Sequence, residues 1–269
     1  MDWKKERYWR KETYAKEPAY PGKEQGKGWM KQLREQAADL LFPRRCPVCQ
    51  EIVVPAGELI CPGCRGKLSD VKGELCLKCG KELIGGEEEY CLNCVRHPKS
   101  FIRGAALFNY NEVSARSMVQ IKYKNKREYL DFYSREMADK LGDKIRRMNA
   151  EALIPVPVHP QRRKQRGFNQ AEELAVRLSE LTRIPFCADI LLRSKKTAPQ
   201  KELTPGQRLK NLEQAFAVRK EKCPKQLSSV ILVDDIYTTG STAEACTRAL
   251  LKAGIPRVYF LAICIGADR

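Results

Sequence analysis

The chain has 269 residues, with 50 lysines and arginines against 33 aspartates and glutamates, and a formal net charge of +17. This length predicts two units, and the excess of positive charge favours polyanionic partners such as nucleic acids or nucleotides. The chain starts with mixed charges instead of the apolar core of a signal peptide, and its longest apolar run, 258–267, is too short to span a bilayer. We therefore expect a cytoplasmic protein that does not insert into a membrane.

Residues 1–28 are rich in Lys, Glu, Tyr, Gly and Pro and show neither helical nor strand periodicity, which predicts a flexible N-terminal extension. Apolar residues then recur at helical spacing from Trp29 to Phe42, so we expect an amphipathic lead-in helix that ends before Pro43. Together with the cysteine-rich segment that follows, this helix makes the first predicted domain, residues 29–100.

Four Cys-x-x-Cys pairs follow at a constant spacing of fifteen residues. They are Cys46 with Cys49, Cys61 with Cys64, Cys76 with Cys79, and Cys91 with Cys94. Two residues between the thiols let both sulfurs of a pair face one tetrahedral ion, and two pairs complete a closed four-cysteine zinc site. The eight cysteines therefore predict two structural Zn²⁺ sites without an open position for catalysis.

The equal spacing leaves two pairings open. Neighbouring pairs can share an ion, which gives a double zinc ribbon, or alternate pairs can interleave; we expect the sequential arrangement. Thiol redox chemistry is the competing interpretation of a Cys-x-x-Cys pair, but a redox motif is normally a single pair. Four pairs in register, in a compartment that keeps thiols reduced, favour metal binding.

From residue 101 onward the pattern is that of an α/β domain, residues 101–269, in which buried strands alternate with amphipathic helices. Strands are predicted at 105–110, 152–158, 230–233 and 258–265, and helices at 113–123, 127–148, 171–181 and 243–252. Pro155 and Pro157 remove ladder donors, so the second strand belongs at an edge or ends near Pro157. The last strand is expected to close the sheet.

Three polar segments of this domain are candidates for ligand contacts. The basic turn Lys122–Arg127 either contacts phosphate or lies in solvent as a charged surface. The loop His159–Gln170 brings four cations to the end of a strand and the start of a helix, which suits a pyrophosphate, although a basic surface loop would look the same. The long polar segment 193–222 is expected to form a lid rather than to be disordered, because it lies between two predicted strands.

The most specific pattern is Val-Ile-Leu-Val-Asp-Asp-Ile-Tyr-Thr-Thr-Gly-Ser-Thr at residues 230–242. Its four apolar residues predict a buried parallel strand, followed by Asp234 and Asp235 and by a hydroxyl-rich turn into a helix. Backbone N–H groups, Gly240 and the hydroxyls build a phosphate cradle. Carboxylates would repel that phosphate, so Asp234 and Asp235 match the vicinal hydroxyls of a ribose. The Gly-Lys-Ser/Thr ending of a P-loop is absent from the sequence.

This stretch resembles the phosphoribosyl pyrophosphate (PRPP) signature of type I phosphoribosyltransferases. Pro155–Pro160, Arg166–Gln170 and several positions within 192–216 narrow the resemblance to the ComF family, phosphoribosyltransferase-like proteins linked to natural competence. It covers about residues 29–269. The resemblance implies an α/β type I phosphoribosyltransferase fold, a mainly parallel sheet flanked by helices, preceded by a small double zinc-ribbon domain.

The resemblance also implies roles for individual residues. Asp234 and Asp235 would hold the ribose and favour the positive charge that develops on its ring, and Arg166, Lys195 and Lys196 are catalytic candidates for stabilising the leaving pyrophosphate. Mg²⁺ is expected on that pyrophosphate. The predicted PRPP-binding residues are Asp234, Asp235, Tyr237, Thr238, Thr239, Gly240, Ser241, Thr242, Val158 and His159.

The expected function is therefore binding of Mg-PRPP, together with a role in DNA uptake during natural competence through the handling of single-stranded DNA. A competence helicase is a further expected partner, and the expected reaction is phosphoribosyl transfer with release of pyrophosphate. Two alternatives stay open: a PRPP-dependent transferase of nucleotide or base salvage that is unrelated to DNA uptake, and a regulator that senses PRPP without turnover. No residue pattern identifies the acceptor.

Overall fold

The computed structural model describes residues 43–83, 85, 88–193, 215–219, 221, 223 and 227–267. The chain divides into two units, residues 1–42 and 43–269, and every element described below belongs to the second. The predicted N-terminal extension, the lead-in helix, most of the predicted lid, and the candidates Lys195 and Lys196 lie outside the described residues.

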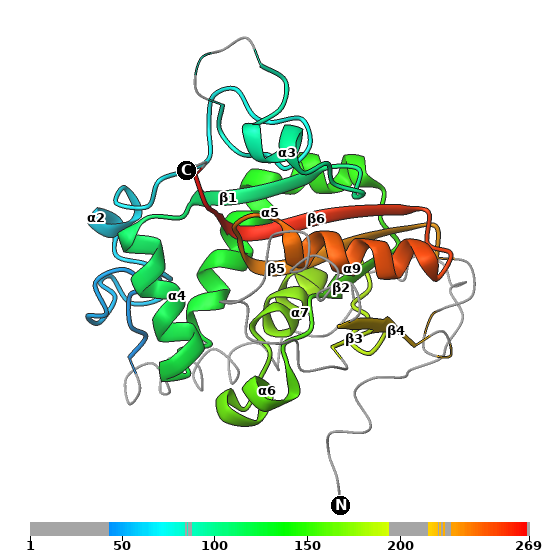
Figure 1. Cartoon of the computed structure of the whole chain (residues 1–269). Coiled ribbons are helices and arrows are strands. Elements are labelled where there is room, and N and C mark those ends of the chain that lie inside the picture. The colour runs from blue at the N-terminus through cyan, green and yellow to red at the C-terminus, as the bar shows by residue number, and fades with distance from the viewer. Residues whose placement is uncertain are drawn as a thin grey trace, which may run out of the picture. The chain divides into compact units, whose positions relative to one another are not determined.

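A four-stranded parallel sheet forms the centre of the second unit (Figure 1). Its strands are β1 (Gly104–Asn109), β2 (Ala152–Pro155), β5 (Ser229–Tyr237) and β6 (Arg257–Ile265), in the spatial order β1-β6-β5-β2. All three strand pairs are parallel. The central strands β5 and β6 are mostly buried along their length, as expected of parallel strands that are covered on both faces.

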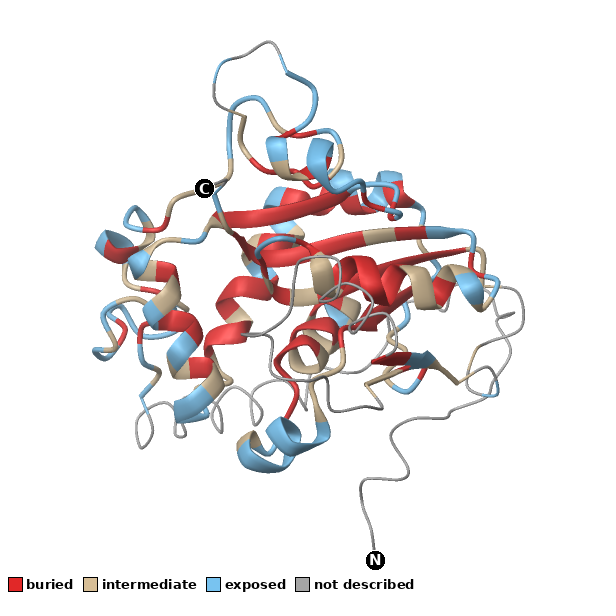
Figure 2. Ribbon diagram, in the orientation of Figure 1, coloured by how far each residue is buried: buried red, intermediate tan, exposed pale blue. Residues whose placement is uncertain are grey.

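Helices cover both faces of this sheet, and the buried residues run between the layers (Figure 2). On one face, α4 (Glu112–Lys124), α5 (Tyr129–Met148) and α7 (Gln170–Thr182) share an apolar cluster with Ile231 and Val233 of β5. On the other face, α9 (Ser241–Lys252) packs in a second cluster with Val230 and Leu232. The alternation of these four residues between the two clusters follows from the two-residue repeat of a strand.

Smaller elements surround this core. Two strands, β3 (Leu191–Arg193) and β4 (Phe216–Val218), pair antiparallel apart from the main sheet. The short helix α6 (Pro160–Arg166) has no buried residue. Two more short helices lie in the cysteine-rich segment: α2 (Pro62–Arg65) begins after Cys61, and α3 (Leu92–Arg96) begins after Cys91. Each contains the second cysteine of its pair.

The cysteine-rich segment covers the outer edge of β1, which would otherwise present unpaired backbone groups. The Asn109 amide donates to the Ser69 carbonyl at 2.8 Å, and the Val71 amide donates to the Leu107 carbonyl at 3.1 Å. At the start of the strand, the Gly104 amide donates to the Lys78 carbonyl at 2.7 Å. The segment therefore belongs to the same compact unit as the sheet.

The structure confirms the α/β architecture and corrects several details. Strand β2 is an edge strand, as its prolines predicted, but it ends at Pro155, before the expected exit near Pro157. The expectation that the last strand closes the sheet is wrong, because β6 lies between β1 and β5. The predicted basic loop contains helix α6, which ends at the left-handed Gly167. Within the described part of the chain, no helix has both the length and the apolar character needed to cross a membrane.

Strand β5 is longer than predicted. The apolar pattern indicated residues 230–233, whereas the strand runs on through both aspartates to Tyr237. The extension forms because β6 is nine residues long and offers partners as far as Ile265, which pairs with Tyr237. The acidic pair is consequently held within the sheet rather than in a loop after it.

Candidate functional site

The eight cysteines of the four pairs form two clusters. Cluster 1 contains Cys46, Cys49, Cys61 and Cys64, and cluster 2 contains Cys76, Cys79, Cys91 and Cys94. The sulfur atoms of each cluster lie within 4.8 Å of one another. This grouping confirms the sequential pairing and excludes the interleaved one for these residues.

The sulfur spacing fits a tetrahedral zinc ion. The Sγ atoms of Cys49 and Cys61 are 3.9 Å apart, and those of Cys79 and Cys91 are 3.6 Å apart. A zinc ion with Zn–S bonds of about 2.3 Å needs sulfurs roughly 3.8 Å apart. Burial raises the pKa of Cys64 to about 12, so a cation is needed for all four sulfurs to be thiolates at neutral pH. Both clusters are thus consistent with structural zinc sites, whose four sulfurs leave no position for substrate.

Cluster 1 is attached to helix α5. Arg44 pairs with Asp131 at 2.8 Å, and Arg65 pairs with Glu136 at 2.7 Å. Apolar residues of the same segment, among them Val53 and Leu68, join the core cluster of α5. Cluster 1 is therefore held mainly against α5.

Cluster 2 is attached to the turn that follows β5. Asn93, which lies between Cys91 and Cys94 in α3, donates from Nδ2 to the Thr239 carbonyl at 3.0 Å. A few residues later, Ser100 donates to the carboxylate of Glu244 in α9 through both its backbone N–H and its Oγ, each at 2.6 Å. Glu244 is only 2% exposed and lies in the first turn of α9. The second cysteine cluster therefore holds both the turn and the helix that the sequence predicted as a phosphate cradle.

The turn itself has the geometry of an anion-binding helix start. Gly240 is the N-cap of α9 with φ at 75°, a left-handed conformation that favours glycine. A Cβ at Gly240 would clash with the ring of Tyr237, so space as well as conformation requires glycine here. Thr238 and Thr239 are exposed, and the Oγ atoms of Thr239 and Ser241 are 2.9 Å apart. The turn thus presents hydroxyls and free amides at a helix N-terminus, the arrangement that binds phosphate.

Tyr237 was predicted to bind PRPP together with the turn residues, but unlike Thr238 and Thr239 it is buried. Its side chain is 2% exposed and packs against Phe101 and Phe260, with ring centroids 6.3 Å and 5.2 Å away. Burial raises the pKa of its hydroxyl. The Tyr237 ring packs against Gly240 and does not face solvent. Any contact of Tyr237 with a ligand would therefore come from its backbone.

The two aspartates carry the unusual electrostatics of the site. Burial, and then the charge of Asp235, raise the pKa of the Asp234 carboxyl well above its usual range. Asp235 forms an ion pair with Lys122 of α4 at 2.5 Å. Burial lowers the pKa of the Arg193 guanidinium in β3, and the charge of Asp234 acts in the opposite direction. Two carboxyl groups close together with one paired cation leave a site that accepts hydroxyl donors or a further cation.

The predicted pyrophosphate loop meets the basic turn after α4. Arg166 donates from Nη2 to the Tyr123 hydroxyl at 3.2 Å, stacks over its ring at 4.9 Å, and donates from Nη1 to Gln170 at 3.1 Å. Arg127 lies 4.2 Å from the Phe168 ring. The two basic segments, separate in sequence, therefore form one surface, with Arg166 at the contact between them.

Val158 and His159 lie between β2 and α6 and are half-buried. The Gln161 amide donates to Nδ1 of His159 at 3.2 Å, so this histidine caps α6. Sequence reasoning did not single out Lys122 within its basic run, and it missed Asn93 and Glu244. No local signal marks Asn93 or Glu244, because each acquires its role from a partner distant in the chain.

Comparisons with known proteins agree with this arrangement. Residues 37–95 match the family described as "Double zinc ribbon domain". Competence protein F of Haemophilus influenzae is 39% identical over 108 residues, which are 40% of this chain and 47% of that protein. The chain thus spans about half the length of that relative.

Two further similarities extend over more of the chain. Competence protein ComFC of Bacillus subtilis is 26% identical over 203 residues, which cover 73% of this chain and 80% of that protein. DNA utilization protein YhgH of Escherichia coli O157:H7 is 27% identical over 174 residues, covering 64% of this chain and 75% of that protein. With the double zinc-ribbon region in front of a parallel α/β sheet, these matches make the chain similar to the competence and DNA utilization proteins of the ComF family.

Proposed function

We propose that the end of β5 and the turn into α9 bind Mg-PRPP and that the protein transfers the phosphoribosyl group to an acceptor. One observation carries this proposal: a left-handed glycine turn rich in hydroxyls starts a helix directly after a strand whose last residues before the turn include an acidic pair, Asp234 and the buried Asp235. Phosphate suits the turn and ribose hydroxyls suit the carboxylates, so both halves of the ligand have a complementary partner.

The turn residues 238–242 would hold the 5′-phosphate through backbone amides and hydroxyls. Asp234 and Asp235 would accept hydrogen bonds from the two ribose hydroxyls. Burial raises the pKa of Asp234, and ligand hydroxyls that donate to its ionised carboxylate would lower that pKa again. Lys122 balances the charge of Asp235 in the meantime.

The transfer step breaks the bond between C1 of the ribose and the pyrophosphate oxygen, and the electron pair leaves with pyrophosphate. The acceptor supplies the electron pair for the new bond to C1 and loses a proton. Positive charge develops on the ribose ring, and the two carboxylates next to it lower the energy of that state electrostatically. Mg²⁺, if bound to the pyrophosphate, would neutralise part of the leaving group's charge. Arg166, at the surface shared by the two basic segments, is the described cation proposed for the same role.

The test is a calorimetric titration of Mg-PRPP into the zinc-loaded protein and into an Asp234→Asn, Asp235→Asn double variant. We expect saturable binding by the wild type and at least a hundredfold loss in the variant, because both ribose partners change. Zinc content and melting temperature serve as controls for folding. An absence of binding by folded wild-type protein would refute the proposal.

A pyrophosphate-release assay with candidate acceptors then separates the enzyme from the alternatives. Release with a nucleobase would support a transferase of salvage. Binding without release from any acceptor would support a regulator that senses PRPP.

A second candidate function is the handling of single-stranded DNA during DNA uptake. It is supported by the net charge of +17 and by the printed names of the relatives, two competence proteins and a DNA utilization protein. A competence helicase remains a proposed partner for this function. We expect binding of a labelled oligothymidylate that weakens steeply with salt, since phosphate contacts release counterions. This binding should persist in the Asp234→Asn, Asp235→Asn variant, which separates it from PRPP binding.

A further inference from the structure

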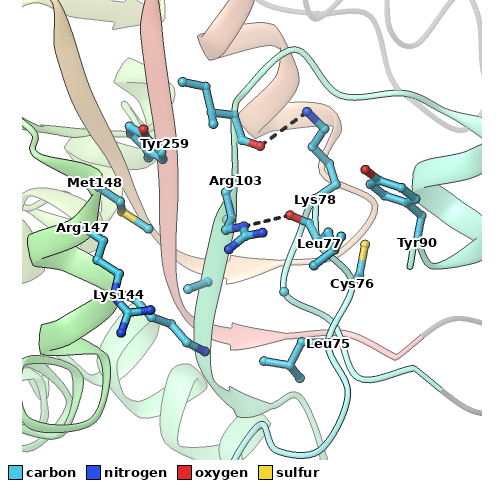
Figure 3. A pocket seen from close by; sticks show the side chains of 14 residues that line it. Leu75, Cys76, Leu77, Lys78, Tyr90, Arg103, Lys144, Arg147, Met148 and Tyr259 are labelled. Atoms are coloured by element: carbon cyan, nitrogen blue, oxygen red, sulfur yellow. Dashed lines mark hydrogen bonds between the residues drawn. The ribbon is translucent and has the colours of Figure 1, made fainter. Parts of the chain in front are cut away.

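A groove of about 540 Å³ lies at the N-terminal end of the sheet, opposite to the acidic end of β5. Its walls come from the cluster 2 segment, the start of β1, the end of α5 and Tyr259 of β6 (Figure 3). The residues of β1 and β6 that line it lie in the first half of their strands, whereas the proposed PRPP site lies at the carboxyl end of β5 and in the turn that follows. The groove is therefore separate from that site.

Positive charge dominates the groove. Lys78, Arg103, Lys144 and Arg147 line it, and no carboxylate occurs among the fourteen lining residues, all of which belong to the described part of the chain. Lys144 and Arg147 are exposed and three positions apart in α5, so they lie on the same face of that helix. Neither forms an ion pair with another residue that the structure describes. These two cations are therefore available to an external anion.

The other two cations are fixed in place. Lys78 donates from Nζ to the Phe101 carbonyl at 2.8 Å, and Arg103 donates from Nε to the Leu77 carbonyl at 3.1 Å. These bonds hold the cationic heads in the groove and leave further N–H donors of Arg103 for a ligand. In Figure 3, Arg103 lies between the α5 side and the cluster 2 side.

Exposed apolar surface accompanies this charge. Tyr90 is 42% exposed, Ile102 43% and Leu77 40%, and Tyr259 is half-buried. Cations beside exposed aromatic faces are the combination that binds single strands, because phosphates meet the cations and unpaired bases stack on the rings. The volume is that of a site for small ligands, which admits a nucleotide or two but not a double helix.

The distribution of acidic and basic residues along the groove predicts how a bound strand is oriented. Glu88 and Glu89 directly precede Tyr90 and do not line the groove. They disfavour phosphate at that end, so phosphates belong at Lys144 and Arg147 and a base belongs against Tyr90.

We propose that this groove binds single-stranded nucleic acid, with Lys144 and Arg147 on the phosphates and Tyr90 on a base. The proposal rests on the second candidate function and names the surface that performs it. It does not depend on PRPP binding.

The experiment measures fluorescence anisotropy of a labelled oligothymidylate with the full-length, zinc-loaded protein. The test variant is Lys144→Glu, Arg147→Glu. The matched control is Lys67→Glu, Arg135→Glu, which makes the same change of net charge at two exposed residues outside the groove. Zinc content and circular dichroism must match the wild type in both.

We expect at least about a tenfold loss of affinity in the test variant and less than about threefold in the control, because only the test variant loses phosphate contacts. The slope of log affinity against log salt should fall in magnitude by about two in the test variant. Tyr90→Ala should weaken binding about fivefold or more without changing that slope, since stacking releases no counterions.

Equal losses of oligonucleotide affinity in the test and control variants would refute the groove as the binding site. DNA would then be handled elsewhere on the protein. An absence of oligonucleotide binding by the wild type would overturn both the groove and DNA handling, and the Mg-PRPP titration would be unaffected. Competition by excess Mg-PRPP would place the strand at the other site and overturn the groove. Equal binding of polyglutamate, lost in the same variant, would identify an acidic polypeptide as the ligand and also overturn it.

Discussion

The two cysteine clusters have the same motif and the same spacing but occupy different environments. In cluster 2 every cysteine is at most 6% exposed, whereas in cluster 1 Cys49 is exposed and Cys61 is half-buried. Cluster 1 packs on α5, and cluster 2 packs between the edge of β1 and the turn before α9. A repeated metal motif has thus acquired one role against α5 and one role next to the proposed PRPP site, through its neighbours and not through its own residues.

The largest expected difference comes from removing each metal site in turn. Cys76→Ser, Cys79→Ser should lower the free energy of unfolding by more than about 3 kcal/mol and abolish Mg-PRPP binding, because the support of Thr239 and Glu244 is lost with the zinc. Cys46→Ser, Cys49→Ser should lose one zinc yet keep most of the PRPP affinity. Zinc analysis, calorimetry and hydrogen exchange of residues 238–244 measure these effects. Equal loss of affinity in both variants would remove the distinction between the clusters.

The next largest difference is expected between two glycine substitutions, one in the turn beside cluster 2 and one beside cluster 1. Gly240→Ala should destabilise the protein by roughly 2–3 kcal/mol, because the left-handed backbone and the Tyr237 ring both oppose a Cβ. Gly66→Ala, at φ −68° with no atom within 4 Å of its Cβ, should change stability by less than about 0.5 kcal/mol. Urea denaturation measures both, and a small effect of Gly240→Ala would mean that the turn can rearrange.

The ionised carboxylate of Asp234, in the site that cluster 2 supports, should destabilise the folded protein. A carboxyl whose pKa is raised by folding opposes folding once the pH exceeds its unfolded pKa of about 3.9. Asp234→Asn should therefore stabilise the protein at pH 8 while abolishing PRPP binding. The stability difference should shrink as the pH falls through about 4 and vanish below about pH 3, where Asp234 is protonated in both states. Denaturation at both pH values decides this, and a destabilised variant at pH 8 would contradict it.

The smallest effect concerns a single hydrogen bond. Asn93→Ala removes the donor to Thr239 and should cost about 1 kcal/mol, seen as roughly a five- to tenfold loss of PRPP affinity. Gly63→Ala changes the equivalent position of the cluster 1 repeat, between Cys61 and Cys64, where no atom lies within 4 Å of the new Cβ. It should leave PRPP affinity unchanged. Calorimetry of the pair tests whether the contact with the turn is specific to cluster 2.

The sequence by itself determined the features that depend on near neighbours along the chain. The Cys-x-x-Cys pairs and their repeat indicated two four-cysteine sites, because the geometry of a metal knuckle is set within four residues. The apolar runs and the helical spacing located the main strands and helices of the described domain to within a few residues. The turn at residues 238–242 was recognisable because its glycine and hydroxyls are contiguous.

Only the tertiary structure decided which distant segments meet. The place of β6 inside the sheet extended β5 through the acidic pair, and it could not be inferred from the composition of either strand. The contacts of Lys122 with Asp235, of Tyr123 with Arg166 and of Asn93 with Thr239 join separate elements. Asn93 and Thr239 are 146 residues apart, and an ordinary side chain at such a separation carries no local signal. Their pairing follows from the packing of the whole unit, which fixes the positions of both partners at once.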